Sequence, residues 1–156
     1  MSDNPVLDQY RRRPDVAEYK QIRREWKTHS IAEDNRDIPG LLSTLTEDCV
    51  YEIVQTGDRW QGHEGAAQFY TELLTAFPDI HFDLQNIVIG PQGVFEEAWV
   101  TATHEGEWRG IAPTGRYIEF MVGILFPWDE AKQKFKGERV YVDFEQVLTR
   151  YGDREQ

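Results

Sequence analysis

Two stretches of the chain repeat apolar residues at the spacing of an α-helix. After Pro14, which suits the first turn of a helix, one face carries Val16, Tyr19, Ile22, Trp26 and His29. A second, more strongly amphipathic run spans residues 64–77 and carries Ala66, Phe69, Tyr70, Leu73, Leu74 and Phe77 on one face. Pro78 ends it. Between the two, Asp37 as a cap and Pro39 in the first turn predict a short helix.

β-branched and aromatic residues dominate the remaining segments, which are separated by turn-rich sequences. These strand-like runs cover residues 49–54, 80–90, 94–108, 117–128 and 138–144, and a short helix at 144–150 follows the last of them. Helices and one strand come first, and a meander of long strands follows. This order predicts a single α+β domain in which helices pack on one side of an antiparallel sheet.

Large side chains occupy both faces of the predicted strand 94–108. One parity carries Ala98, Val100, Ala102, His104 and Trp108, and the other carries Phe95 and Trp99. Because the helices can cover only one face of the sheet, we expect the other face to meet a second subunit, which predicts a homodimer.

Composition narrows the class of partner. The 156 residues suit one domain, and 40% hydrophobic and 13% aromatic residues supply both a core and an apolar cavity. Lys and Arg number 17 against 28 Asp and Glu, so the net charge of -11 repels phosphate backbones and anionic lipids. We therefore expect no nucleic-acid and no membrane partner, and a small apolar or aromatic molecule as the ligand.

Cysteine usage and the absence of long apolar runs indicate the compartment. Cys49 is the single cysteine, so no intramolecular disulfide can form. The first residues lack the apolar run of a signal peptide, and no segment offers the ~20 apolar residues that span a bilayer. These features predict a cytoplasmic protein.

Three stretches resemble one known family: GHEGAAQFYTELLTAFPD at 62–79, THEGEWRGIAPTGRYIEF at 103–120 and ERVYVDFEQVLTR at 138–150. They look like the SnoaL-like polyketide cyclases (ester cyclases) of the nuclear-transport-factor-two-like superfamily. The resemblance covers residues 14–151 and leaves an N-terminal extension, 1–13, and a C-terminal tail, 152–156. It implies a cystatin-like, cone-shaped fold: a curved antiparallel sheet wraps around the long first helix and leaves a pocket open at one end.

Asp143 is the first candidate for catalysis. It matches the position where cyclases of this family keep an acid/base carboxylate, which moves protons during an intramolecular aldol ring closure. A dry pocket raises the pKa of such a carboxyl and makes it a better proton shuttle. Alternatively, Asp143 caps the helix that starts at Phe144 or Glu145, since Asp is a favoured cap residue. A side chain in the cavity favours catalysis, and a bond to a backbone amide two or three residues on favours the cap.

Two histidines are further candidates. His104 matches a histidine that lines the family's pocket, where it would hold a substrate oxygen or orient Asp143. A lone histidine on an apolar face is otherwise a satisfied interior residue. His29 lies on the apolar face of the first helix and is expected either to reach the same cavity or to bind carbonyls at the helix end.

Aromatic side chains are expected to form the wall of the pocket, because flat ligands match such surfaces. Trp60 and Trp108 lead this set, since both lie where a strand leaves the sheet for a loop. The other members are Trp26, Phe69, Phe120 and Tyr51.

We expect no metal and no cofactor. His29, His104 and Asp143 are far apart in sequence, whereas metal ligands tend to come in local pairs. No Gly-x-Ser-x-Gly turn or glycine-rich phosphate loop is present. Three functions stay open: a cyclase-type acid/base enzyme, a dehydratase-like or epoxide-hydrolase-like enzyme, and a binding protein without turnover.

Overall fold

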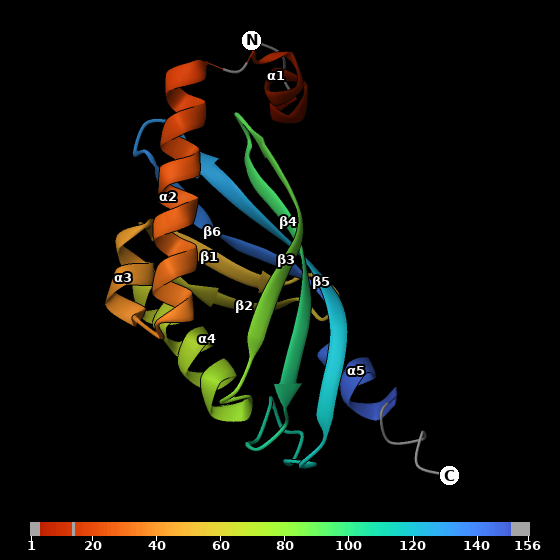
Figure 1. Cartoon of the computed structure of the whole chain (residues 1–156). Coiled ribbons are helices and arrows are strands. Elements are labelled where there is room, and N and C mark those ends of the chain that lie inside the picture. Colours follow the sequence, from red (N-terminus) through yellow and green to blue (C-terminus); the bar gives the residue numbers. More distant parts are fainter. Residues whose placement is uncertain (1–3, 14, 151–156) are drawn as a thin grey trace.

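A computed structural model describes residues 4–13 and 15–150. Its elements in chain order are α1 Pro5–Arg11, α2 Val16–Asp34, α3 Ile38–Ser43, β1 Leu45–Ile53, β2 Asp58–Gln61, α4 Gly62–Ala76, β3 His81–Gly90, β4 Gly93–Thr103, β5 Tyr117–Asp129, β6 Lys134–Tyr141 and α5 Phe144–Arg150. The helices α2, α3 and α4 lie on one side of a strongly bent sheet (Figure 1). The α+β class expected from the sequence is therefore confirmed.

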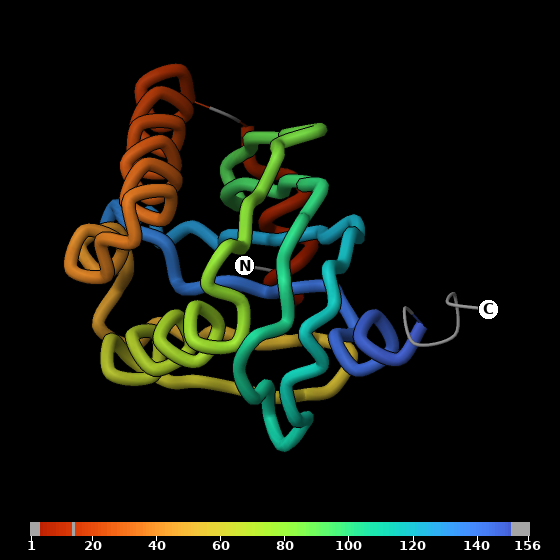
Figure 2. Tube along the Cα trace, turned by 60° about the horizontal axis from the view of Figure 1, so that its bottom comes forward, coloured from red at the N-terminus to blue at the C-terminus, as the bar shows by residue number. Residues whose placement is uncertain are grey.

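The sheet has six strands in the order β2-β1-β6-β5-β4-β3. All neighbouring strands are antiparallel except β1 and β6, which pair in parallel. This parallel pair joins the first long strand to the last one, and the sequence order alone did not predict it. Figure 2, turned from the first view, shows the sheet curving around the space that α2 and α4 fill.

Two elements were not predicted from the sequence. The N-terminal extension contains α1, whose N-cap Asn4 accepts a hydrogen bond from the Val6 N–H at 3.0 Å. Strand β2, at the edge of the sheet, lies in a turn-rich segment that was expected to be a loop. The C-terminal tail, and residue 151 of the predicted domain, lie outside the described residues.

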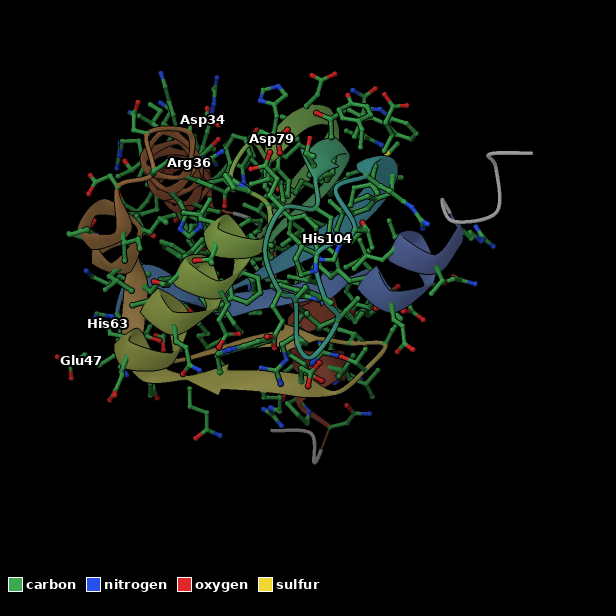
Figure 3. The ribbon with its side chains drawn as sticks, turned by 90° about the horizontal axis from the view of Figure 1, so that it is seen from below. Asp34, Arg36, Glu47, His63, Asp79 and His104 are labelled. Atoms are coloured by element: carbon green, nitrogen blue, oxygen red, sulfur yellow. The ribbon has the colours of Figure 1, made fainter. Side chains whose placement is uncertain are left out.

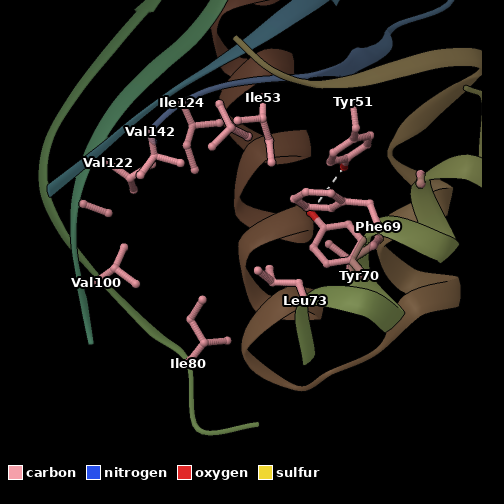
Figure 4. Packing of buried hydrophobic residues seen from close by; sticks show 14 of the residues in the cluster. Tyr51, Ile53, Phe69, Tyr70, Leu73, Ile80, Val100, Val122, Ile124 and Val142 are labelled. Carbon is pink, nitrogen blue, oxygen red and sulfur yellow. Dashed lines mark hydrogen bonds between the residues drawn. The ribbon is translucent and has the colours of Figure 1, made fainter. Parts of the chain in front are cut away.

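The core lies between α2, α4 and the concave face of the sheet. Figure 4 shows part of it, including Leu73 of α4, Ile53 of β1 and Val122 and Ile124 of β5. Within this apolar surrounding, the hydroxyl groups of Tyr51 and Tyr70 face each other at 3.2 Å. The core is thus largely apolar, with a group of polar side chains around Tyr51 and Tyr70.

The outer face of the sheet carries large apolar side chains with substantial exposure, among them Phe95, Trp99 and Met121. The homodimer expected from this face stays a prediction. Among the described residues, no helix combines the length and the apolar character needed to cross a bilayer.

Candidate active site: a buried cluster of carboxyl, imidazole and phenol groups

Four elements bring a compact polar cluster together inside the cone. His29 and Glu33 stand one turn apart on α2, so both point to the same side of the helix. Glu138 comes from β6, Tyr70 from α4 and Tyr51 from β1. Parallel pairing of β1 and β6 sets Tyr51 directly beside Glu138 in register.

Glu138 is the centre of the cluster. Its Oε1 lies 3.0 Å from the Nε2 of His29 and accepts a hydrogen bond from the Tyr70 hydroxyl at 3.0 Å. The same hydroxyl lies 3.3 Å from Oε2 of Glu33 and 3.2 Å from the hydroxyl of Tyr51. Tyr70 therefore connects both carboxyl groups, and a proton can be shared among them.

The tautomer of His29 follows from its other neighbour. The Thr44 hydroxyl donates its one proton to the Leu41 carbonyl at 2.7 Å, so its oxygen must accept from Nδ1 of His29, also at 2.7 Å. Neutral His29 then has a bare Nε2 facing Glu138. Because a bare nitrogen and a carboxylate are both acceptors, the contact needs a proton on one of them, and Glu138 supplies it when neutral.

Burial sets the protonation states. It raises the pKa of Glu138 to about 8, although Tyr70 and Tyr51 donate hydrogen bonds that oppose the rise. Burial, and then repulsion from Glu138, raises the pKa of Glu33 to about 8. Burial lowers the pKa of His29 to about 4. Near neutral pH the cluster therefore holds its protons on carboxyl groups rather than on the imidazole.

A third interior carboxyl extends the cluster along β4. Glu96 is 8% exposed and accepts a hydrogen bond from the Trp26 indole N–H at 3.1 Å. Burial, followed by repulsion from Glu138, raises the pKa of Glu96 to about 7. Among the described residues, no lysine or arginine pairs with Glu33, Glu96 or Glu138. Protons can neutralise this interior, and so could a metal ion, because the ligand atoms of His29, Glu33 and Glu138 lie within 4.8 Å of one another.

An interior cavity of about 20 Å³ touches the cluster. Glu33, Tyr70 and Glu138 are its polar lining, and the rest of its wall is apolar: Phe69, Leu73, Phe82, Phe120, Val122, Ile124, Val140 and Phe144. This volume holds about one water molecule. The arrangement can thus donate and accept protons in a place with almost no bulk water.

Asp143 lies elsewhere. It is half-buried, and its Oδ1 accepts the backbone N–H of Gln146 at 3.0 Å, three residues on, as the N-cap of α5. It lines an outer groove between α5 and β5 and is not part of the cavity wall. This contact is the one expected for the cap alternative. A catalytic role of Asp143 is not tested by it and stays a prediction.

Replacing Asp143 separates the two roles. We expect Asp143→Ala to lose about 1 kcal/mol of stability in urea unfolding, because the Gln146 N–H loses its acceptor. Asp143→Asn keeps a cap of similar quality and should retain almost all of the stability. Equal losses in both variants would contradict the cap. Loss of activity in Asp143→Asn without loss of stability would show that the carboxylate itself is needed.

His104 lies in the loop that follows β4. Figure 3 views the molecule from the end where this loop lies and labels His104. The strand expected to reach Trp108 ends at Thr103: the His104 N–H still bonds to the Arg116 carbonyl, but the N–H groups of Glu105 and Gly106 bond to the Ala76 carbonyl of α4. His104 is fully buried against Phe77. Its Nδ1 accepts the Thr114 N–H at 3.2 Å, and its buried Nε2 has no partner among the described residues. Its catalytic role stays a prediction.

The predicted pocket residues fall into three groups. Phe69 and Phe120 line the interior cavity. Tyr51 joins the polar cluster through Tyr70, and Trp26 binds Glu96. Trp108 lines a surface pocket, while Trp60 packs against Phe69 and under the guanidinium of Arg109.

Sequence reasoning found His29 but missed its carboxyl partners. The signals were present: Glu33 lies four residues after His29 on the predicted helix, and Glu138 shares the inward parity of Val140 and Val142. Glu96 likewise shares the inward parity of Val94 and Ala98. An acidic residue at an inward position of a strand is the pattern that would have located the site.

A bent sheet wrapped around helices is the nuclear-transport-factor-two-like fold, which a structural neighbour from Burkholderia pseudomallei with a TM-score of 0.68 shares. The chain belongs to the SnoaL-like polyketide cyclase family, whose model matches residues 21–149. None of the curated proteins compared with the chain matches it significantly.

Solved structures with this fold are similar over most of their length. A putative SnoaL-like polyketide cyclase from Jannaschia sp. CCS1 has a TM-score of 0.71 and 20% identity, covering 88% of this chain and 94% of its own. IdmH, a putative polyketide cyclase from Streptomyces antibioticus, has a TM-score of 0.68 and 21% identity, and the match covers 85% of this chain and 99% of IdmH. AclR, a putative hydroxylase from Streptomyces galilaeus, has a TM-score of 0.67 and 21% identity, and the match covers 91% of this chain and 85% of AclR. At this identity the likeness concerns the fold.

Proposed function

We propose that the protein is a cofactor-free acid/base enzyme that closes a ring in a small apolar carbonyl compound by an intramolecular aldol reaction. The observation that carries the proposal is a pair of carboxyl groups, Glu33 and Glu138, with a pKa of about 8 on the wall of an apolar cavity. Membership of the SnoaL-like polyketide cyclase family supports the reaction class.

The coupled carboxyls supply both partners of a proton transfer. When one of them is ionised and the other neutral, the carboxylate takes a proton from a carbon beside a carbonyl, and the C–H electron pair becomes an enolate. The Tyr70 hydroxyl, which contacts both carboxyls, donates a hydrogen bond to the enolate oxygen, and the neutral acid does so once its proton leaves its resting acceptor, which for Glu138 is Nε2 of His29. Ketosteroid isomerases hold an enolate in the same way, with a tyrosine and a carboxylic acid kept neutral by its apolar site.

Ring closure then needs no further group. The enolate carbon attacks a second carbonyl carbon of the same molecule, so a C–C bond forms and the attacked oxygen gains the negative charge. That oxygen takes the proton of the neutral carboxylic acid. The proton taken from carbon replaces it, and the cluster returns to its initial state with an isomer of the substrate as product.

His29 acts as a positioning residue in this scheme. Its Nδ1–H is fixed by Thr44, so the bare Nε2 favours a proton on the facing oxygen of Glu138. The proposal therefore moves the acid/base role from Asp143 and His104 to the groups on the cavity wall. It also accounts for the apolar lining, because a dry wall keeps the carboxyl pKa near neutrality.

Deuterium uptake tests the proposal. The parent protein in D₂O should catalyse exchange at the activated CH₂ of 2-tetralone, an apolar ketone, as followed by NMR. Glu138→Gln and Glu33→Gln should slow this exchange by about 10² to 10⁴-fold, since general acid/base groups contribute that much. Glu105→Gln, which removes an exposed carboxyl, is the matched control and should exchange like the parent.

Two outcomes would overturn the assignment. If the parent binds the ketone without exchange above buffer, the protein is a binding protein without turnover. If Asp143→Asn abolishes exchange while Glu138→Gln retains it, the acid/base group is Asp143 and not the interior pair.

A further inference from the structure

Two spaces in the protein meet at one side chain. The interior cavity of about 20 Å³ touches Phe144, and so does a surface pocket of about 350 Å³. That surface pocket is lined by Ile53, Thr56, Asp58, Trp108, Arg109, Gly110, Ile111, Phe144 and Glu145. Among the described residues, Phe144 is the one that both linings share.

The interior cavity is too small for an organic molecule, because a cavity that binds benzene has about 150 Å³. The surface pocket exceeds that size, but it does not reach Glu33 or Glu138. A substrate held in the surface pocket can therefore contact the carboxyl pair only if part of the wall between the two spaces moves.

Phe144 is the part of that wall with the fewest backbone constraints. It begins α5, a helix of seven residues that is held at its start by the Asp143–Gln146 bond. Its ring packs against three other rings: Phe77 at 5.7 Å, Trp108 at 4.9 Å and Phe120 at 5.6 Å between centroids. The rest of the cavity wall belongs to α2, α4 and long strands, whose backbones are fixed by continuous hydrogen bonding.

We propose that Phe144 is the barrier between an outer and an inner subsite of one binding site. The outer subsite is the surface pocket beside Trp108 and Arg109, and displacement of the Phe144 ring joins it to the interior carboxyls. This inference rests on the proposed function only for the use of the inner subsite.

The two linings differ in chemistry and so define the ligand class. The inner wall is apolar apart from hydroxyl and carboxyl donors, which suits a ring that carries a carbonyl group. The rim of the outer subsite carries Asp58 and Arg109, joined by an ion pair at 2.9 Å, together with Thr56 and Glu145. The ligand class is thus an amphipathic ketone: the carbonyl-bearing ring passes Phe144, and a polar substituent stays at the rim.

A second route must be distinguished from this one. Phe120 lines both the interior cavity and the outer groove of about 590 Å³ between α5 and β5. Gln146 lines that groove and not the surface pocket, whereas Ile111 lines the surface pocket and not the groove. Filling each space with one bulky residue therefore tests one route at a time.

The test is stopped-flow binding of prodan, a neutral naphthyl ketone whose emission reports an apolar surrounding. Ile111→Trp fills the outer subsite and should slow association at least tenfold. Gln146→Trp fills the groove instead and should associate like the parent. The reverse pattern, slow association in Gln146→Trp only, would overturn the proposal, as would equal rates in all three proteins.

Variants at Phe144 test the barrier itself. Phe144→Leu, with Phe144→Ala as the larger change, should raise the association rate at least fivefold, because less side chain must move. Phe135→Leu is the control, since this buried phenylalanine lines neither space. Melting curves verify that each variant is folded at the assay temperature. Unchanged rates in a folded Phe144→Leu would contradict the barrier.

The binding test of the two subsites and the exchange test of the proposed function can give independent results. Slowed prodan association in Ile111→Trp together with no ketone exchange by the parent would support the two subsites and refute catalysis. Exchange that depends on Glu138, together with association insensitive to Ile111→Trp, would support catalysis and refute this route.

Discussion

Replacement of Gly137 by alanine is expected to destabilise the protein by about 4 kcal/mol or more. Gly137 has φ +113, in a region that residues with a Cβ atom rarely adopt. An added Cβ would lie 2.0 Å from the Val50 carbonyl oxygen of β1, which is backbone and cannot rotate away. Strand β6 must then separate from β1 at the position next to Glu138. Urea unfolding measures the loss.

Gly57→Ala is the matched control for that variant. Gly57 also has a positive φ, +77, but nothing lies within 4 Å of its added Cβ. Only conformational strain remains, so the expected loss is about 1 kcal/mol. Similar losses in both variants would show that the close approach of β1 and β6 contributes nothing beyond backbone strain.

Stability is expected to fall as the pH rises through neutrality, by about 2 kcal/mol or more between pH 6.5 and 8. Glu33 and Glu138 have an ordinary pKa of 4.5 when unfolded and about 8 when folded. Their contribution is complete below about pH 4.5 and is lost as the pH rises towards 8, because ionisation in the interior is unfavourable. Unfolding midpoints in urea at each pH measure the slope.

His29 contributes with the opposite sign. Its pKa of about 4 in the folded protein lies below the ordinary 6.5, so its contribution is lost only as the pH falls from 6.5 towards 4. Above pH 6.5 the carboxyls therefore dominate the slope. Glu138→Gln should roughly halve it, whereas Glu105→Gln, an exposed substitution, should leave it unchanged. A parent profile that rises between pH 6.5 and 8 would contradict the raised carboxyl pKa values.

Helical periodicity located the two main helices because each buries one long apolar face. The run from Val16 begins α2, and the run that ends at Pro78 gives α4. The alternation of inward and outward side chains was less reliable at the end of β4. Apolar residues of one parity continue to Trp108, but the strand ends at Thr103 because the backbone turns to bond with Ala76 of α4. No local sequence pattern contains this tertiary contact.

The candidate site could be predicted only in part. His29 was found because it falls on the apolar face of its helix, and Tyr51, Phe69 and Phe120 because they are aromatic residues on predicted strands and helices. Glu33 was missed although the helical spacing places it on the same face as His29, because glutamate is a residue type that is seldom buried. Asp143 fitted two roles equally well from sequence, since a strand-end aspartate before a helix suits both a cap and a cavity.

The parallel pairing of β1 with β6 has a consequence for the order of folding. Strand β1, residues 45–53, can pair with β6 only after residues 134–141 have been made. The strand pair that contains Tyr51 and Glu138 therefore joins segments separated by more than half of the chain length. Contacts this distant in sequence form late, because the entropy of closing a long loop must first be overcome. During synthesis, the antiparallel β3–β4 hairpin can form while the ribosome still holds the last strand, whereas the acidic interior assembles only after release of that strand.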